Sequence, residues 1–205
     1  MNERLSIKLS NEKNTDEGVW LKLPVFAEQL QTALAFIGVQ GGEQNKDYFI
    51  TGFESPIEAV KLLSLENLQN AEIDEINYLA AELAILEPED IDVLNAIGER
   101  EGKWDNTAEL LDYVYNTCVF EYIPGILTHT QLGEYYLKSD KIEIPEEWLD
   151  AVDVEKLGQL AAEDEGGVFI KQGYIAESGA GWISINEIPR EYCVTKNKGM
   201  SQQIL

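Results

Sequence analysis

Carboxylates recur at helical spacing between residues 72 and 101 of this chain. The acidic residues there stand at positions 72, 74, 75, 82, 87, 89, 90, 92, 99 and 101. Carboxylates three or four positions apart share one face of a helix and repel each other by about a few tenths of a kcal/mol per pair. Because this repulsion costs stability, we expect the charge to serve a function. A dense row of fixed negative charges is suited to attracting a cationic partner.

The negative charge is confined to one part of the chain. Residues 51–166 contain 28 Asp and Glu against 6 Lys and Arg, so they carry 22 of the 23 net negative charges. Residues 1–50 and 167–205 are nearly neutral. Adaptation to high salt would place acid in the flanks as well, so the confinement favours a field directed at a cationic partner.

The acidic part is predicted to fold, because apolar residues alternate with its carboxylates. Ile73, Ile76, Leu79 and Leu83 recur at helical spacing and can be buried on one face. The chain as a whole is 44% hydrophobic, which is typical of a globular protein.

The pattern of elements predicts an α+β fold in three parts, with small β-sheet units at both ends and an acidic helical domain between them. The expected domains are residues 1–72, 73–116 and 117–205. In the first, we expect strands at 4–10, 19–23 and 47–53, a polar loop at 11–18, a helix from Pro24 to about 36, and helix starts at Pro56 and Ser64.

The other two domains follow from local start and stop signals. In the second, we expect helices at 74–86, 88–101 and 107–115. In the third, we expect a strand at 119–123, a helix at 131–138, one or two helices within 145–163, a hairpin over 168–177, a candidate third strand at 182–185 and a polar tail at 196–205.

Side chains suited to catalysis or metal binding are scarce. His129 is the only histidine, and Cys118 and Cys193 stand 75 positions apart, so no zinc motif is present. The glycines between 38 and 42 lack the Lys of a phosphate-binding loop, and residues 90–95 lack the glycine of a calcium loop. Among 38 carboxylates some pair always lies close, so such a pair is uninformative. We therefore expect no enzyme activity and no metal site.

Direct nucleic-acid binding and membrane insertion are also disfavoured. The acidic part would repel phosphates. The sequence has no run of 18 apolar residues, and its first residues lack the layout of a secretory signal. We therefore expect a cytoplasmic protein in which Cys118 and Cys193 are reduced thiols.

The charge density can be compared with that of duplex DNA. Thirty helical residues span about 45 Å, and a duplex of that length carries roughly 26 charges, more than twice the ten acids of residues 72–101. The 22 net charges of one chain correspond to about 11 base pairs. Several acidic helices together, or two subunits, would approach duplex density. This arithmetic permits a DNA mimic without requiring one.

Short motifs along the chain resemble those of the ArdA antirestriction family. In chain order they are 18–24 (Gly-Val-Trp-Leu-Lys-Leu-Pro), 47–50 (Asp-Tyr-Phe-Ile) with Glu54, 73–77 (Ile-Asp-Glu-Ile-Asn), 122–125 (Tyr-Ile-Pro-Gly), 132–137 (Leu-Gly-Glu-Tyr-Tyr-Leu), 144–146 (Ile-Pro-Glu), 166–170 (Gly-Gly-Val-Phe-Ile) and 173–175 (Gly-Tyr-Ile). Their order and spacing over residues 5–185 carry the resemblance.

The resemblance implies an elongated, acidic, three-domain protein that dimerises and mimics bent B-form DNA. Such a protein would occupy the DNA-binding groove of a type I restriction-modification enzyme, without catalysis or a cofactor. The chain is longer than expected of the family at residues 39–46, at 64–72 and beyond 186. Arg190, Lys196 and Lys198 would interrupt a phosphate-like surface if the tail folded onto it.

The expected partner-binding residues are carboxylates of the middle and final helices. They are Glu75, Glu82, Glu87, Glu89, Asp90, Asp92, Glu99, Glu101, Glu109, Asp112, Glu146, Glu147, Asp150, Asp153 and Glu155. Tyr135, Tyr136 and Leu137 are candidates for a dimer contact, and core packing explains these three residues equally well.

A second class of function stays open. The chain could be an acidic chaperone-like or inhibitory module for a basic protein unconnected with restriction. Both classes predict binding that weakens with salt. Competition with duplex DNA separates them, because only a mimic must be displaced by DNA from its partner.

Overall fold

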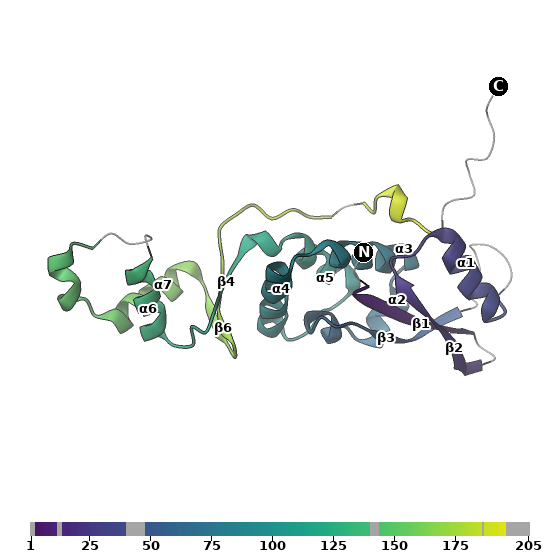
Figure 1. Ribbon diagram of the computed structural model, residues 1–205, viewed down its shortest axis with the longest axis horizontal. Coiled ribbons are helices and arrows are strands. Elements are labelled where there is room, and N and C mark those ends of the chain that lie inside the picture. The colour runs from purple at the N-terminus through teal and green to yellow at the C-terminus, as the bar shows by residue number, and fades with distance from the viewer. Residues whose placement is uncertain (1–2, 12–13, 40–47, 140–143, 186, 196–205) are drawn as a thin grey trace, which may run out of the picture.

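The computed structural model describes residues 3–11, 14–39, 48–139, 144–185 and 187–195 of the chain. The molecule is elongated, with the N-terminal sheet and α1 at one end and α6 and α7 at the other (Figure 1). Two small antiparallel sheets lie toward the ends of the chain with helices between them, so the α+β prediction is confirmed.

The N-terminal sheet has β1 in its centre. The strands are β1 (Leu5–Asn11), β2 (Asn14–Leu23) and β3 (Tyr48–Glu54), in the order β2-β1-β3, and both pairings are antiparallel. Leu5, Ile7 and Leu9 alternate along β1 and are buried, as expected of a strand with one face on a core. The polar loop expected at 11–18 is wrong for most of that range, because Asn11 pairs with Asn14 and β2 begins there.

Helix α1 (Ala27–Phe36) starts three residues later than its proline suggested. The side chain of Asn77 explains the delay, because it occupies the backbone polar groups of Val25. Its Oδ1 accepts from the Val25 nitrogen at 2.8 Å, and its Nδ2 donates to the Val25 oxygen at 3.2 Å. Val25 therefore stays outside the helix and is tied to the middle of the chain.

The middle of the chain is helical, and its boundaries follow the expected signals. The elements are η1 (Ala59–Leu62), α2 (Leu65–Asn70), α3 (Ile73–Ile85), α4 (Pro88–Glu101) and α5 (Thr107–Tyr115). Ser64 Oγ accepts from the Asn67 nitrogen at 3.1 Å, and Asn106 Oδ1 accepts from the Glu109 nitrogen at 2.8 Å. Gly102 ends α4 with a φ of 77°. The helix starts expected at Ser64, Pro88 and Asn106 are confirmed.

One hydrophobic core joins the N-terminal sheet to these helices. It contains Ile7 of β1, Leu79 of α3, Ile97 of α4 and Leu110 of α5, each fully buried. We call residues 3–119 the N-terminal body. The core crosses the expected domain boundary after residue 72, and that boundary remains a prediction.

A second unit, residues 120–177, lies beyond α4, and we call it the distal unit. Its elements are β4 (Phe120–Pro124), α6 (His129–Lys138), η3 (Glu146–Ala151), α7 (Val154–Glu165), β5 (Val168–Ile170) and β6 (Gly173–Glu177). The sheet order is β4-β6-β5, with antiparallel pairs.

The distal sheet separates two cores, as its alternating side chains show. Phe120, Tyr122 and Ile175 pack with the core of the N-terminal body. Ile123 and Tyr174 pack with the smaller core formed by α6 and α7. Neighbouring residues of a strand point to opposite faces of the sheet, so one face of this sheet packs on the N-terminal body and the other packs on α6 and α7.

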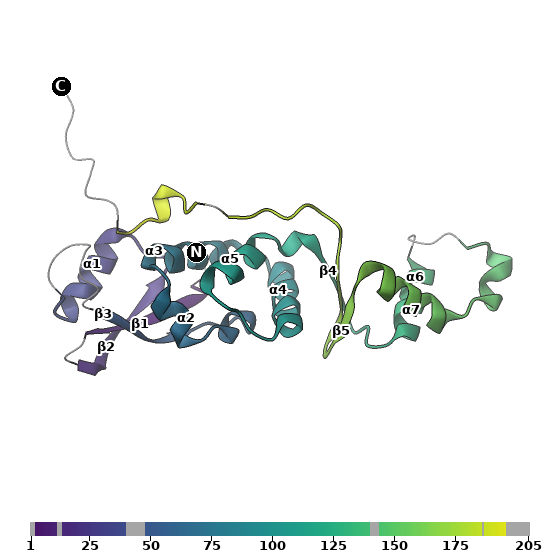
Figure 2. The same ribbon diagram turned by 180° about the vertical axis from the view of Figure 1, so that it is seen from behind.

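From Ser178 the described residues run back along the N-terminal body, and the last of them lie near α1 (Figure 2). We call residues 178–185 and 187–195 the strap; it includes the short helix η4 (Arg190–Tyr192). The strand expected at 182–185 is wrong, because this segment is irregular. In place of a neighbouring strand, side chains bind the backbone of this segment: Asp112 of α5 and Asn116, the residue after α5. Asn116 Oδ1 accepts from the Ile183 nitrogen at 2.8 Å, and Asp112 Oδ1 accepts from the Ile185 nitrogen at 3.2 Å.

Candidate protein-binding surface

The exposed carboxylates of α4 border the groove between α4 and the distal sheet. Glu89 and Asp92 are on α4 and line this groove together with Glu58 and Glu99. Glu89 is exposed, as is Glu87 directly before α4. The groove has a volume of about 890 Å³, and Tyr122 lines its distal side. Glu89 and Asp92 are exposed, so they can meet cationic groups of a partner without rearrangement of the fold.

The C-terminal turn of α4 uses its charges to hold the distal sheet. Glu99 Oε1 accepts from the Lys171 nitrogen at 2.7 Å. Arg100 Nη2 lies 2.7 Å from Glu101 Oε1, and Arg100 Nη1 lies 3.6 Å from Glu177 Oε1. The guanidinium carbon of Arg100 is 4.9 Å from the centre of the Phe120 ring. Glu99 and Arg100 therefore join the two units. Of the two expected partner-binding residues in this turn, Glu99 is partly buried and Glu101 is exposed.

Four other expected contact residues accept hydrogen bonds that support the fold. Glu75 accepts from the hydroxyl of Thr107. Asp90 Oδ1 accepts from Thr117 Oγ1 at 3.3 Å, and Glu109 Oε2 accepts from the Asp105 nitrogen at 2.6 Å. The fourth, Asp112, accepts from the strap. A carboxylate held in this way is less free to meet a partner.

Among the expected partner-binding carboxylates, Glu82 resembles a charged phosphate least. Burial raises the pKa of its carboxyl, and a hydrogen bond from Tyr78 acts in the opposite direction. Burial, followed by the nearby Glu82 charge, raises the pKa of Tyr78 to about 12. A partly buried carboxyl with a raised pKa is a weaker anion than a solvated one.

In the distal unit, Asp153 and Glu155 stand at the start of α7, and Glu155 is exposed. Asp153 caps the helix, because its Oδ1 accepts from the Lys156 nitrogen at 3.0 Å. The roles of Glu146, Glu147 and Asp150 remain predictions. Glu163 and Asp164, also exposed, were missed, although the run of acids at 163–165 was a visible signal.

The three candidate dimer residues of α6 differ in exposure. Tyr136 is 4% exposed and donates its hydroxyl hydrogen to Glu165, which also accepts from Tyr174 Oη at 3.0 Å. Tyr135 and Leu137 are partly buried. Tyr136 therefore serves the distal core, and a contact with a second subunit would fall on Tyr135 and Leu137.

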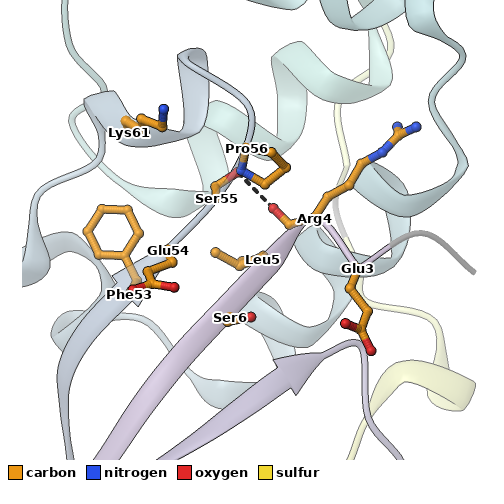
Figure 3. A pocket seen from close by; sticks show the side chains of 9 residues that line it. All are labelled: Glu3, Arg4, Leu5, Ser6, Phe53, Glu54, Ser55, Pro56 and Lys61. Carbon is orange, nitrogen blue, oxygen red and sulfur yellow. Dashed lines mark hydrogen bonds between the residues drawn. The ribbon is translucent and has the colours of Figure 1, made fainter.

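A hollow of about 610 Å³ between β1, β3 and η1 has mixed charge (Figure 3). Glu3 and Glu54 line it together with Arg4 and Lys61. Nη1 of Arg4 donates to the carbonyl oxygens of Leu83 and Leu86, at 2.7 Å each, at the end of α3. Arg4 therefore stabilises the packing of α3 on β1, and this hollow differs from the acidic groove.

Within the described ranges, no three His, Cys, Asp and Glu side chains are grouped as metal ligands would be. None of the helices in the same ranges combines the length and the apolar character needed to cross a bilayer.

The fold and its exposed carboxylates define an elongated acidic α+β protein. The family model for ArdA, described as an antirestriction protein, matches residues 14–176. The chain therefore belongs to the ArdA antirestriction family, which confirms the resemblance found in the motifs. No curated protein matches the sequence significantly. The family match ends inside β6, so the strap lies beyond it.

Proposed function

We propose that this protein inhibits type I restriction-modification enzymes as a DNA mimic. It occupies the DNA-binding groove of the enzyme and blocks both cleavage and methylation. It acts in the cytoplasm by occupancy alone, without catalysis or a cofactor, and as a homodimer. Family membership supports the antirestriction role. The DNA mimicry, the type I partner and the dimer are what the family resemblance implies, and the charge and the elongated shape of the chain are consistent with them.

The observation that carries the proposal is the placement of the charge on a folded, elongated scaffold. Residues 51–166 hold 22 of the 23 net negative charges, and the helices in this range keep Glu89, Glu155 and Glu163 exposed. One chain carries the charge of about 11 base pairs, and a dimer that of about 22. A groove that binds duplex DNA by its phosphates would attract such a surface.

The direct test titrates the protein into a type I enzyme and measures DNA cleavage and methylation at low salt. We expect both activities to fall at stoichiometric protein and to recover when the concentration of the substrate DNA is raised, because substrate and mimic would compete for one groove. If neither activity falls, the mimicry proposal is wrong.

The alternative is an acidic module that binds another cationic protein. The same surface favours it, since exposed carboxylates do not by themselves select a DNA-binding groove. In that case, binding would weaken with salt but would not compete with duplex DNA.

A further inference from the structure

The strap is attached to α3 by hydrogen bonds, most of them to its own backbone, and by the Tyr192 ring, whose centroid lies 5.1 Å from that of Tyr78. Asp74 Oδ1 accepts from the nitrogens of Val194 and Thr195, at 2.8 and 3.1 Å, and its Oδ2 accepts from Thr195 Oγ1 at 2.6 Å. Asn77 Nδ2 donates to the Tyr192 oxygen at 3.0 Å. These bonds join α3 to a segment that lies far along the chain.

The other end of the strap is held by Asn116. Its side chain accepts from the Ile183 nitrogen at 2.8 Å and donates to the Ile183 oxygen at 2.7 Å, so it binds both polar groups of one residue. The Trp182 ring also meets the Tyr113 ring edge-on, with centroids 5.2 Å apart. The strap is therefore fixed at two separate places.

The anchoring side chains are buried. Asp74, Asn77 and Asn116 are 6%, 1% and 1% exposed. Burying a polar side chain without a partner is unfavourable, and here the strap supplies part of the pairing. The body is thus built to receive this segment, and the contact is more than an accidental fold-back of a tail.

Most of the strap itself is exposed and has little regular structure. Residues 178–184 are exposed, and among the described strap residues only Cys193 and Val194, at 7% and 4%, are buried. A segment with few buried apolar contacts opens at a lower free-energy cost than a core does. Val194 is a member of the core of the N-terminal body, and Ile185, Ile188 and Tyr192 pack against that core. Release of the strap therefore exposes these few side chains, and it costs less than unfolding the whole body.

We propose that the strap is a releasable clasp that fixes the orientation of the distal unit relative to the N-terminal body. It leaves the distal sheet at Glu177 and is anchored on α3, so it adds a second connection beside the contact of α4 with that sheet. If the protein acts as a DNA mimic, closure also fixes the spacing between the carboxylates of α4 and those of α7; that consequence rests on the proposed function, and the clasp does not.

The thiol of Cys193 reports whether the strap opens. In the full chain with the exposed Cys118→Ser, we expect Cys193 to react with a thiol reagent much faster than the protein unfolds globally, and at a rate nearly independent of low urea. Thr195→Val removes one bond to Asp74, while Thr195→Ser keeps the hydroxyl. We expect about fivefold faster labelling in the Val variant and little change in the Ser variant.

Small-angle X-ray scattering of the full chain tests the orientation. Ile183→Pro removes the nitrogen-bound hydrogen that Asn116 accepts, and Ile183→Ala keeps it. We expect the double variant Ile183→Pro/Thr195→Val to show a broader distance distribution than Ile183→Ala/Thr195→Ser, at unchanged helix content.

Two results would contradict the proposal that the strap is a releasable clasp. If Cys193 labels only as fast as the protein unfolds, the strap is part of the cooperative core. If labelling is fast but the scattering curves coincide, the contact between α4 and the distal sheet alone sets the orientation. Because neither measurement uses a restriction enzyme, failure of the clasp and failure of the proposed function are distinguishable.

Discussion

Gly133 of α6 and Gly158 of α7 face each other where the two helices cross, and neither position has room for a side chain. A Cβ on Gly158 would lie 1.8 Å from the His129 oxygen and 2.7 Å from the Gly133 nitrogen. A Cβ on Gly133 would lie 1.9 Å from the Val154 oxygen. All three of these atoms belong to the backbone, so the two glycines set the separation of the helices.

Gly158→Ala is therefore expected to push α6 and α7 apart. We expect the free energy of unfolding to fall by about 3 kcal/mol, since the helices must separate or the backbone must distort. Chemical denaturation followed by circular dichroism measures this loss. Gly181→Ala is the matched control, because a Cβ there meets no atom within 4 Å. Equal stability of the two variants would show that the crossing tolerates a methyl group.

Glu82→Gln tests the partly buried carboxyl of α3. Because burial raises the pKa of Glu82 in the folded state, the folded protein keeps this proton to a higher pH than the unfolded chain does. Ionisation of Glu82 therefore costs stability, and the free energy of unfolding falls as the pH rises from the ordinary range of a glutamate through the raised pKa.

The amide that Glu82→Gln introduces cannot ionise but still accepts from Tyr78. We expect this substitution to raise the free energy of unfolding at pH 7 by about 0.5 kcal/mol and to leave it unchanged well below about pH 4. Thermal denaturation across this pH range measures the difference. Glu89→Gln removes an exposed charge from α4 and serves as the control; if it stabilises equally, general relief of repulsion is the cause.

Signals close to an element boundary were readable from the sequence. Ser64, Pro88 and Asn106 start helices through bonds or backbone restrictions within one turn, as their residue types predicted. The helix starts expected at Pro24 and Pro56 are wrong, because α1 and η1 each begin three residues later. The strap depends instead on pairs such as Asp74 with Val194, which are 120 positions apart. Nothing in the sequence around 182–185 distinguishes a strand from a segment bound by Asn116.

The candidate site likewise has one property that the sequence alone predicts and one that depends on residues far apart in the chain. The concentration of charge follows from counting and needs no structure. Whether a given carboxylate is free depends on tertiary neighbours, and Glu75 and Glu89 look alike in the sequence. One accepts from Thr107 and is partly buried, whereas the other is exposed on α4.

Tyr136→Phe tests the tyrosine pair around Glu165. Burial is the main cause of the raised pKa of both Tyr136 and Tyr174, and the nearby Glu165 raises both further. Removing the Tyr136 hydroxyl deprives Glu165 of one hydrogen-bond donor, so we expect the free energy of unfolding to fall by about 1 kcal/mol. Urea denaturation measures the change. Tyr115→Phe, at a position 43% exposed, should have little effect.

Leu137→Glu tests the dimer contact proposed for α6. Because Leu137 is only partly buried within one chain, a glutamate there can be accommodated in the monomer but opposes an apolar interface. We expect the dimer dissociation constant to rise by about tenfold or more, measured by sedimentation equilibrium. Thr130→Glu adds the same charge at an exposed position of α6. An equal effect of both variants, or none, would place the dimer contact elsewhere.

Charge reversal at the α4 groove tests the proposed function itself. If the protein acts as a DNA mimic, single substitutions should do little, because the negative charge is spread over many carboxylates. Glu89→Lys/Asp92→Lys instead replaces two anions that line one groove with cations. We expect the concentration needed for half-inhibition of a type I enzyme to rise by about tenfold or more at low salt. Added salt should reduce this difference, because it screens exposed charges.

The matched control reverses two carboxylates in the nearly neutral N-terminal flank. Glu3→Lys/Glu28→Lys changes the net charge by the same amount, and Glu3 is exposed. The ion pair lost between Glu3 and Lys22 is also exposed and therefore contributes little to stability. If the two double variants weaken inhibition equally, net charge rather than the α4 groove governs binding. If neither does, the partner binds another surface of the protein.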